Sequence, residues 1–456
     1  MKMQLLPSSS RSSPLLSITH DVDRMQITFV SIVTISGTIL LAILYLVLPS
    51  KSNYRYLHDD HYHLNESPFI PDPVHEAQRG KINLVQESGK IDPVKEPVKC
   101  PEVGSIKYNT KYPLTEPEVI SPFETRYKIA LITDLDTKSK REANKSIWSS
   151  FMLKGYLTQI KPSAPNSILS SGKASSSSAP VDDYKYAISW ERKSIELTSS
   201  LSFNGRGMEL SELVVFNGSL LSCDDRTGII YEILLSSNDV VPRYIISDGD
   251  GSTSIKSAFK CEWMTVKDEK LYIGGFGKEW TNSSGAVINF NPQFVKVIDV
   301  HGSVSHLNWR SQFLSLLSGV GIHFPGYIIH ESCSWSNFHR KWYFMPRRVS
   351  TTAYKESEDE LKGSNLLLSS EDFKQVKVTT IGPSIPSHGF SSFKFIPNTN
   401  DHHVIALKTV EVKDETSTFI TIFTLEGHIL LPEIKVGTGL SDTNAASRKY
   451  EGIEFI

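Results

Sequence analysis

Hydrophobic and polar positions follow one pattern through most of the chain. From residue 127 to the C-terminus, short runs rich in Val, Ile, Phe and Tyr alternate with turn signals, and helical periodicity is scarce. Residues 258–280 are a clear example, because two apolar runs flank a charged turn at 267–270. This pattern is typical of β-hairpins. We therefore expect residues 124–456 to form an all-β body.

The hairpin layout recurs along the body. A strand, a tight turn and a return strand begin at each of four residues, and a fifth copy ends after one strand. The five starting residues are Ser211, Glu262, Glu331, Ser391 and Glu451. Subtraction of their positions gives intervals of 51, 69, 60 and 60 residues, which suit four-stranded propeller blades. The sequence predicts a five-bladed β-propeller, with the last strand pairing beside residues 127–133 so that no edge stays free.

The same five residues, here called the channel ring, are expected to meet at the central channel, because each begins an inner strand. Three carboxylates and two hydroxyls would then face one another. Repulsion among the carboxylates would raise their pKa values unless a cation lay between them. Hard oxygen ligands in a wide ring favour Ca²⁺ over Mg²⁺. The alternative is that the glutamates begin their strands at a solvated rim.

A membrane anchor is expected near the N-terminus. Residues 27–48 are uncharged and apolar, long enough to cross a hydrocarbon core of roughly 30 Å as a helix. No small-residue cleavage site follows, so an uncleaved signal anchor is favoured over a removed signal peptide. Residues 1–26 would form a cytoplasmic tail, and the polar, proline-rich residues 49–123 a stem.

Four N-x-S sequons lie after the anchor: Asn65, Asn144, Asn217 and Asn282. Their placement favours a lumenal body. We expect a single-pass type II protein of the endoplasmic reticulum or Golgi membrane, which cleavage would release as a secreted form. Sequons also arise by chance, and Asn217-Gly218 fits a hairpin turn.

Composition excludes some function classes. Lys and Arg total 48 against 50 Asp and Glu, so no basic field would hold nucleic acid. The four cysteines contain no CxxC pair, which argues against zinc; one or two disulfides remain open, and their pairing cannot be read. Residues 161–183, rich in Ser, Pro and Ala, are expected to be a flexible surface insertion.

The body resembles the calcium-activated nucleotidases of the apyrase family from about residue 127 to the C-terminus. The resemblance rests on "ITDLDTKSK", "GMELSELVVFNGSLLSCDDRTGIIYEI", "SDGDG", "CEWMTVKDEKLYIGGFGKEWT", "GYIIHESCSWS", "FMPRR", "HGFSSFKFIPNT" and "KYEGIEFI". It implies a five-bladed propeller that hydrolyses nucleoside diphosphates, and variably triphosphates, with Ca²⁺. It also implies that all five channel-ring residues are calcium ligands.

Phosphoryl transfer to water also needs a group that orients the water and positive charge around the phosphate. The resemblance places one essential aspartate at Asp225, which we assign as general base, and another at Asp134 or Asp136. The alternative for "CDDRTG" is an Asp-rich turn. Candidate substrate contacts are Arg226, Lys278, Trp280, Arg347 and Arg348. For the last two, solvated surface charges are the alternative.

Two other motif interpretations fail. "GGFGKEW" lacks the following helix and GK[ST] of a P-loop, and Phe259 stands where an EF-hand loop from Asp248 needs glutamate.

The favoured function is a lumenal enzyme that removes the UDP or GDP left by glycosyl transfer, supporting glycosylation such as proteoglycan biosynthesis. Alternatives are a secreted apyrase acting on ADP and ATP, a non-catalytic calcium-stabilised binding platform, and a lactonase or esterase with His330 or His388 as base. A homodimer is possible.

Overall fold

The computed structural model describes residues 107–456, except 145, 163–183, 256 and 414. The expected tail, membrane helix, most of the stem, Asn65 and nearly all of the insertion lie outside these residues. The described part belongs to one compact unit, Val98–Ile456. No helix within it is long and apolar enough to cross a membrane.

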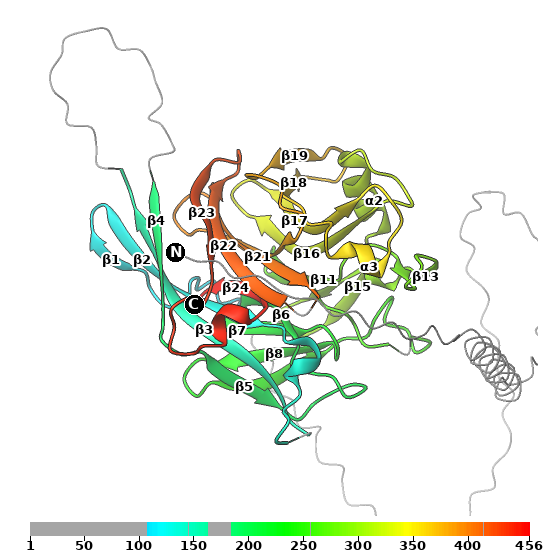
Figure 1. The fold of residues 1–456 in the computed structure, drawn as a ribbon, viewed down its shortest axis with the longest axis horizontal. Helices are drawn as coiled ribbons and strands as arrows, with labels where there is room; N and C mark the ends of the chain where they lie inside the picture. The colour runs from blue at the N-terminus through cyan, green and yellow to red at the C-terminus, as the bar shows by residue number, and fades with distance from the viewer. Residues whose placement is uncertain (1–106, 145, 163–183, 256, 414) are drawn as a thin grey trace, which may run out of the picture. The chain divides into compact units, whose positions relative to one another are not determined.

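Five antiparallel sheets of four or more strands, and one separate two-stranded hairpin, make up the described part of this unit (Figure 1). The first contains β1 (Glu118–Ser121), β2 (Glu124–Thr133), β3 (Trp148–Ile160), β4 (Lys185–Trp190), β5 (Ile195–Ser199) and β24 (Tyr450–Phe455). The second contains β6 (Leu210–Phe216), β7 (Ser219–Asp224), β8 (Ile229–Leu234) and β9 (Asp239–Ile245). The third contains β10 (Trp263–Lys267), β11 (Lys270–Gly274), β14 (Phe294–Ile298) and β15 (Val304–Asn308), and it is accompanied by a hairpin of β12 (Trp280–Thr281) and β13 (Val287–Asn289).

The last two sheets follow the same plan. The fourth contains β16 (Tyr327–Ser336), β17 (Lys341–Ser350), β18 (Leu366–Ser370) and β19 (Lys377–Thr380). The fifth contains β20 (His388–Phe395), β21 (His403–Val412), β22 (Glu415–Thr424) and β23 (Ile429–Lys435). Helical segments are short: η1 (Asp136–Ser139), η2 (Asn291–Gln293), α2 (Arg310–Gly319), α3 (Glu356–Asp359) and η3 (Ala445–Ser447).

The five inner strands close a ring, which confirms the five-bladed propeller. Contacts link β6 to β10, β10 to β16, β16 to β20, β20 to β24, and β24 back to β6. The expected turns are also present: positive φ angles at Asn217 and Gly218, and at Asp268 and Glu269, reverse the chain between paired strands.

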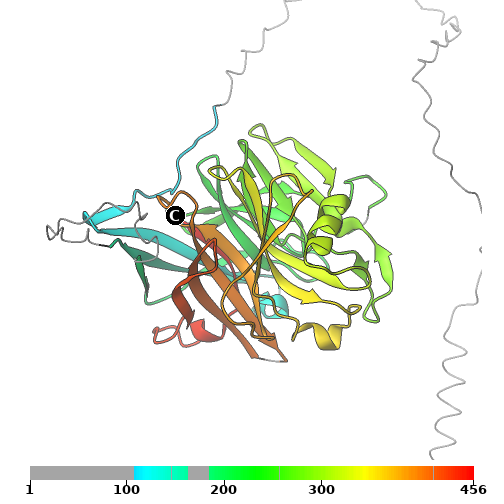
Figure 2. The same ribbon diagram turned by 90° about the horizontal axis from the view of Figure 1, so that it is seen from above.

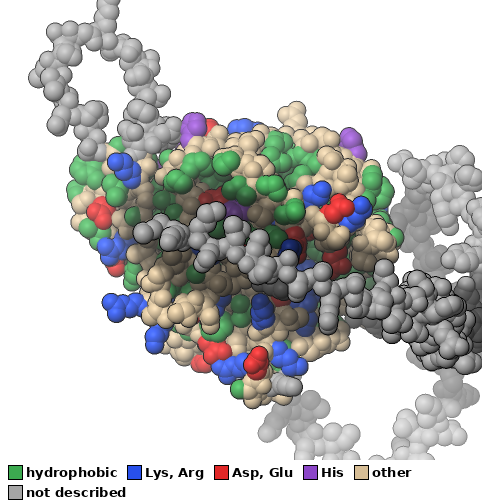
Figure 3. Space-filling model, viewed as in Figure 1, with side chains coloured by type: hydrophobic (Ala, Val, Ile, Leu, Met, Phe, Trp, Pro, Cys, Tyr) green, Lys and Arg blue, Asp and Glu red, His purple; other side chains and the backbone are tan. Residues whose placement is uncertain are grey.

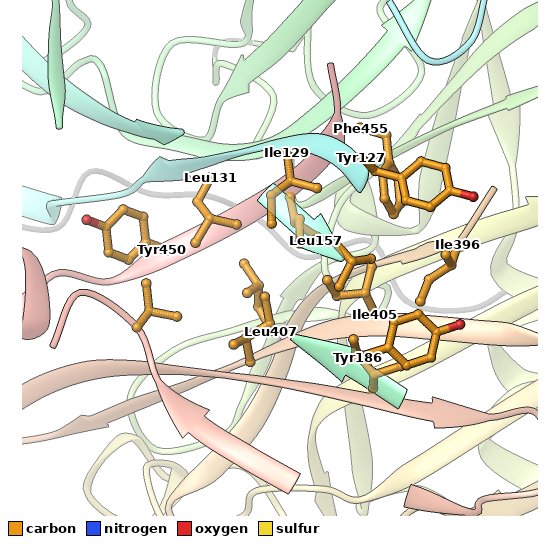
Figure 4. Close-up of a cluster of buried hydrophobic side chains, with 14 of the residues drawn as sticks. Tyr127, Ile129, Leu131, Leu157, Tyr186, Ile396, Ile405, Leu407, Tyr450 and Phe455 are labelled. Carbon is orange, nitrogen blue, oxygen red and sulfur yellow. The ribbon is translucent and has the colours of Figure 1, made fainter. Parts of the chain in front are cut away.

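The C-terminal strand completes the first sheet, as expected. β24 pairs antiparallel with β2 from Phe455, opposite Ile129, to Tyr450, opposite Thr133. The C-terminus accordingly lies beside the cyan N-terminal strands in both ribbon views (Figures 1 and 2). Figure 4 shows the buried cluster behind this closure, where side chains of β2, β3, β4 and β24 meet those of β21. Burial of this apolar surface stabilises the closed ring.

Folded structure begins before residue 124, where the all-β body was predicted to start. β1 pairs with β2, and the chain before it also contacts the propeller. The Tyr112 hydroxyl donates to Glu454 Oε1 at 2.9 Å, and the Asn109 N–H donates to Asn217 Oδ1 at 2.7 Å. The polar, proline-rich composition of this segment does not predict such hydrogen bonds to the propeller.

A disulfide joins Cys223 at the end of β7 to Cys261 just before β10. It links the second blade to the third and settles a pairing that the sequence left open. Cys333 is a buried free thiol. On the face drawn in Figure 3, basic and acidic side chains are interspersed and no broad basic field is seen, in line with the balanced composition.

Candidate active site

The channel-ring residues lie where the strand ladders are irregular. Ser211, Ser391 and Glu451 are each skipped in the pairing of their strand, and Glu331 lies in a shifted stretch of β16. Glu262 immediately precedes β10, and its N–H donates to the Gly274 carbonyl at 2.9 Å. β-Bulges re-aim side chains and are frequent beside active sites. At four of the five positions, the repeat seen in the sequence is therefore a repeat of irregular inner strands.

A pocket of about 180 Å³ lies over this region, and every residue lining it is charged. We call it the charged pocket. Its lining residues are Asp134, Asp136, Asp225, Arg226, Lys260, Glu262, Glu331, Arg347, Arg348, Asp359, Glu360, Glu411, Lys449 and Glu451. The structure thus brings together the three ring glutamates, all three predicted catalytic aspartates and three of the predicted substrate-binding residues.

The buried groups of the channel ring fit a hard divalent cation. Ser211 is 2% exposed, and its Oγ has no hydrogen-bond partner among the described residues. Burial, reinforced by the charges of Glu331 and Asp225 and opposed by Lys260, raises the pKa of Glu262 to about 8. Burial also raises the pKa of Glu451 well above its usual value. A buried hydroxyl without a partner and carboxylates whose burial opposes ionisation are donors suited to Ca²⁺.

A second group of carboxylates, the acidic trio, was not fully anticipated. Side-chain oxygens of Asp134, Glu209 and Asp225 all lie within 4.8 Å of one another, and all three residues are buried. Burial and the charges of the two aspartates raise the pKa of Glu209 to about 7, although hydrogen bonds from Arg206 oppose this shift. The trio is a further place where oxygen ligands could hold a metal ion.

The two adjacent aspartates of "CDDRTG" have different roles. Asp224 is fully buried and accepts the N–H groups of Met208, Arg226 and Thr227, so it builds the turn. The N–H of Asp225 donates to the Glu209 carbonyl at 3.0 Å, which leaves its side chain at the pocket. The turn alternative therefore holds for Asp224 alone.

The "DLD" segment places both of its aspartates at the pocket. Asp134 is 2% exposed and accepts from Lys449 Nζ at 2.9 Å. Burial raises the pKa of Asp134, but the charge of Lys449 and the N–H of Asp136 outweigh burial and bring this pKa to about 2. Burial and the charge of Asp134 raise the pKa of Asp136. Lys449 Nζ also lies 2.6 Å from Asp136 Oδ2, so it pairs with both aspartates, of which Asp134 is the more deeply buried.

Basic side chains bridge these acidic groups. Lys260 Nζ lies 2.5 Å from Asp225 Oδ2 and 2.7 Å from Glu262 Oε1, so it links the acidic trio to the channel ring. Arg347 Nη1 lies 2.5 Å from Glu331 and 2.8 Å from Glu451. Interspersed charges of both signs hold the pocket's geometry before any ligand binds.

Sequence reasoning missed Glu209, Lys260 and Lys449. Each precedes a channel-ring residue by two positions, in E-x-S, K-x-E and K-x-E patterns, so comparison of the repeats at that offset would have found them. The equivalent position before Ser391 is Gly389. A Cβ there would lie 2.6 Å from Arg347 Cγ and 2.5 Å from its carbonyl oxygen, so glycine leaves room for the arginine.

Both predicted phosphate clamps are buried, which overturns the surface-charge alternative. Arg347 is 6% exposed and Arg348 is 3% exposed. Arg348 Nε lies 3.8 Å from Asp359 Oδ2, and its Nη1 has no hydrogen-bond partner among the described residues. A buried guanidinium with a free donor at a pocket suits phosphate binding.

Lys278, one of the candidate substrate contacts, does not line the charged pocket. Its Nζ donates to the Glu279 carbonyl at 2.9 Å and to Thr281 Oγ1 at 2.8 Å, and it lies 4.5 Å from the centre of the Tyr354 ring. The sequence "GGFGKEW" shows that Lys278 follows a glycine-rich turn, but it does not show in which direction the lysine side chain points. Trp280 lines a neighbouring pocket instead.

The histidine base of the lactonase or esterase alternative finds no support. His330 is buried between Phe313 and Phe344, and burial lowers its pKa to about 3. His388 Nδ1 lies 2.7 Å from Glu433. Neither histidine lines the charged pocket.

Two of the four predicted sequons, Asn144 and Asn282, are exposed. Asn217 is half-buried in its hairpin turn.

Fold and site together define a β-propeller whose channel opens into a pocket suited to cations and phosphate. The sequence matches the family model for apyrases over residues 135–456. It is 47% identical over 351 residues to soluble calcium-activated nucleotidase 1 of Rattus norvegicus, covering 77% of this chain and 78% of that protein. It is 38% identical over 356 residues to an apyrase of Cimex lectularius, covering 77% and 88%. The chain belongs to the apyrase family.

Proposed function

We propose that this protein is a Ca²⁺-dependent nucleotidase that hydrolyses nucleoside diphosphates such as UDP and GDP, and some triphosphates, to the monophosphate and phosphate. The observation that carries this is the charged pocket, in which two carboxylate clusters lie beside buried guanidinium groups. Phosphoryl transfer requires this combination of cation ligands and fixed positive charge. The relatives named calcium-activated nucleotidase and apyrase support the same reaction and metal.

The chain's own residues divide the work. Ser211, Glu262, Glu331, Ser391 and Glu451 would hold Ca²⁺. When bound, Ca²⁺ supplies Lewis acidity to the phosphate oxygens. Asp225 orients the attacking water and accepts its proton. Arg226 and Arg348 stabilise negative charge on the phosphate, and Arg347 keeps Glu331 and Glu451 in place. A binding platform would not need Asp225, Arg226 and the two "DLD" aspartates in one pocket.

We place the enzyme in the lumen of the endoplasmic reticulum or Golgi, anchored by residues 27–48, where it removes the nucleotide left by glycosyl transfer. The Cys223–Cys261 disulfide supports an oxidising compartment. The exposed Asn144 and Asn282 sequons support it too. A second candidate is a secreted enzyme acting on ADP and ATP; the relative named apyrase in Cimex lectularius supports nucleotide hydrolysis for either candidate.

A substrate panel tests the proposal. The full chain is assayed for phosphate release from UDP, GDP, ADP and the corresponding triphosphates, each with Ca²⁺, Mg²⁺ or a chelator. We expect chelation to abolish activity and Mg²⁺ to restore little of it, because a wide oxygen ring suits the larger ion. Rates in Mg²⁺ equal to those in Ca²⁺ would refute the metal assignment. No phosphate release from any nucleotide would refute the enzyme.

A further inference from the structure

The disulfide between Cys223 and Cys261 joins two segments that both carry residues of the charged pocket. Cys223 precedes Asp225 by two residues. Cys261 stands between Lys260 and Glu262. Asp225, Lys260 and Glu262 all line the charged pocket. The disulfide therefore connects the turn that carries the proposed base to the segment that carries a proposed calcium ligand.

The sheets hold the two joined segments to different degrees. Cys223 lies on β7, which pairs with β6 on one side and with β8 on the other. Cys261 lies in the connection between β9 and β10, outside any strand. An isolated bridge pairs Ala258 of this connection with Ser247, three residues before the cysteine. The disulfide thus ties a segment outside the sheets to a strand that is paired on both sides.

The contact that this link maintains is made by Lys260. The lysine Nζ lies 2.5 Å from Asp225 Oδ2 and 2.7 Å from Glu262 Oε1. The lysine side chain is 28% exposed, and an ion pair from a flexible, partly solvated lysine holds its partners weakly. The covalent link beside the lysine keeps the cysteine Cα atoms 6.1 Å apart, which limits how far the two backbone segments can separate.

Burial makes this disulfide a permanent link. Cys223 and Cys261 are each 0% exposed, within an apolar cluster that also contains Phe259 and Met264. Reduction requires a thiolate to reach one of the sulfur atoms, and this packing denies that access. A disulfide also stabilises a fold by restricting the unfolded chain. An experiment therefore has to separate positioning from stabilisation.

We propose that the Cys223–Cys261 disulfide holds the Asp225 turn in register with Lys260 and Glu262 and so positions Asp225 for catalysis. Neither cysteine lines the charged pocket, so both act through Asp225, whose carboxylate orients the attacking water. Displacement of a catalytic group by about 1 Å can cost roughly 10² in rate. This inference rests on the proposed nucleotidase function and adds two positioning residues to it.

The test is a double-mutant cycle between the disulfide and Asp225. The disulfide is removed by combining Cys223→Ala with Cys261→Val, which keeps apolar volume in the cluster, and kinetics with UDP are measured at saturating calcium. In the parent we expect this removal to lower kcat by roughly tenfold or more, with KM within about twofold. In Asp225→Asn the same removal should change kcat by less than about twofold, because the group that the disulfide positions is already absent.

Leu271→Ala is the matched control for lost stability. Leu271 is fully buried in the same apolar cluster, but it lies on β11 opposite Val266, at the far end of β10 from Glu262. The control and the disulfide-free protein should both melt below the parent. At a temperature where all three are folded, only the disulfide-free protein should lose kcat.

A second measurement applies if the disulfide-free protein does not fold. The parent is titrated with dithiothreitol in mild denaturant, and mass spectrometry of alkylated peptides follows the opening of the disulfide. Activity lost before the circular dichroism signal supports the positioning role. Simultaneous loss of activity and signal refutes it.

The outcomes separate this inference from the proposed function. If the parent hydrolyses UDP and the disulfide-free protein keeps its kcat, the disulfide only stabilises the fold, and the enzyme stands. An equal loss of kcat in the parent and in Asp225→Asn also refutes the inference, because the disulfide would then act elsewhere.

If the parent hydrolyses no nucleotide, the proposed function fails, and calcium titration of the melting temperature decides the register. Glu262 directly follows Cys261, so removal of the disulfide should raise the calcium concentration for half-maximal stabilisation by roughly tenfold, as for loss of a group that orients a metal ligand. Leu271→Ala should leave that concentration unchanged. An unchanged concentration in the disulfide-free protein would refute the inference.

Discussion

Single residues of the charged pocket differ in what they contact, and this decides what each can do. Arg347 and Arg348 are neighbours in sequence and both are buried, but Arg347 lies within 3 Å of two channel-ring glutamates. Among the described residues, the Arg348 side chain has one distant ion-pair partner, Asp359 at 3.8 Å. A guanidinium already paired with carboxylates positions them, whereas one with a free donor is available to a ligand.

Replacement of Arg348 should therefore weaken substrate binding without weakening calcium binding. For Arg348→Met we expect a KM for UDP at least about tenfold higher, as for loss of a buried charged hydrogen bond. The calcium concentration giving half-maximal thermal stabilisation should not change. Lys278→Met is the matched control, since that lysine donates only to its own hairpin, and its KM should equal the parent's. A normal KM in Arg348→Met would remove this residue from the substrate site.

The sequence predicted residues of the site unevenly. The channel-ring residues were found because each repeats a strand-start position; the structure places four of them on inner strands and Glu262 immediately before β10. Glu209, Lys260 and Lys449 were not found, because a charged residue near a turn has the same pattern as a solvated one. Only tertiary proximity shows that Lys260 joins Asp225 to Glu262.

Strands and turns were the most predictable elements. Alternation and the Asn-Gly signal placed the hairpins of β6–β7 and β10–β11 correctly, because tight turns depend on local backbone conformation. The ten-residue helix α2 was not expected within an all-β pattern. β1 was also missed, and the disulfide pairing was left open because it depends on contact between segments 38 residues apart.

The closing strand gives a prediction for stability. Phe455 on β24 is fully buried in the cluster of Figure 4. Phe455→Ala should lower the free energy of unfolding by about 3–5 kcal/mol, the usual cost of emptying a buried phenylalanine site. Val119→Ala on β1, where the side chain is 75% exposed, is the control and should cost little. Denaturant unfolding measures both, and equal costs would mean that β24 does not carry the closure.

At the scale of the whole molecule, the site depends on ring closure. β24 carries Glu451 and pairs with β2, after which Asp134 follows directly. The N–H of Asp134 donates to the Lys449 carbonyl at 3.0 Å, so the two chain ends of the propeller meet at the charged pocket. Closure of the propeller by β24 therefore also brings Asp134, Lys449 and Glu451 together in the charged pocket.

Removal of the Ser-rich insertion should leave this assembly intact. β3 and β4 remain paired up to Ile160 opposite Lys185, so a short glycine-serine turn can join them after deletion of residues 161–183. We expect the melting temperature and the kcat for UDP to stay close to those of the parent. Loss of folding in the deleted chain, seen by circular dichroism, would show that the insertion packs on the body.

The central claim is that the channel ring binds calcium while Asp225 performs chemistry. It is tested by titrating calcium against both melting temperature and UDP hydrolysis for Glu331→Gln, Asp225→Asn and the parent. Glu331→Gln should need more calcium than the parent for thermal stabilisation and for UDP hydrolysis, and high calcium should partly restore both. Asp225→Asn should keep the parent's calcium-dependent stabilisation while turnover falls by roughly 10² to 10⁴, without rescue. An Asp225→Asn protein that loses calcium stabilisation, or keeps most of its turnover, would contradict this division of the site.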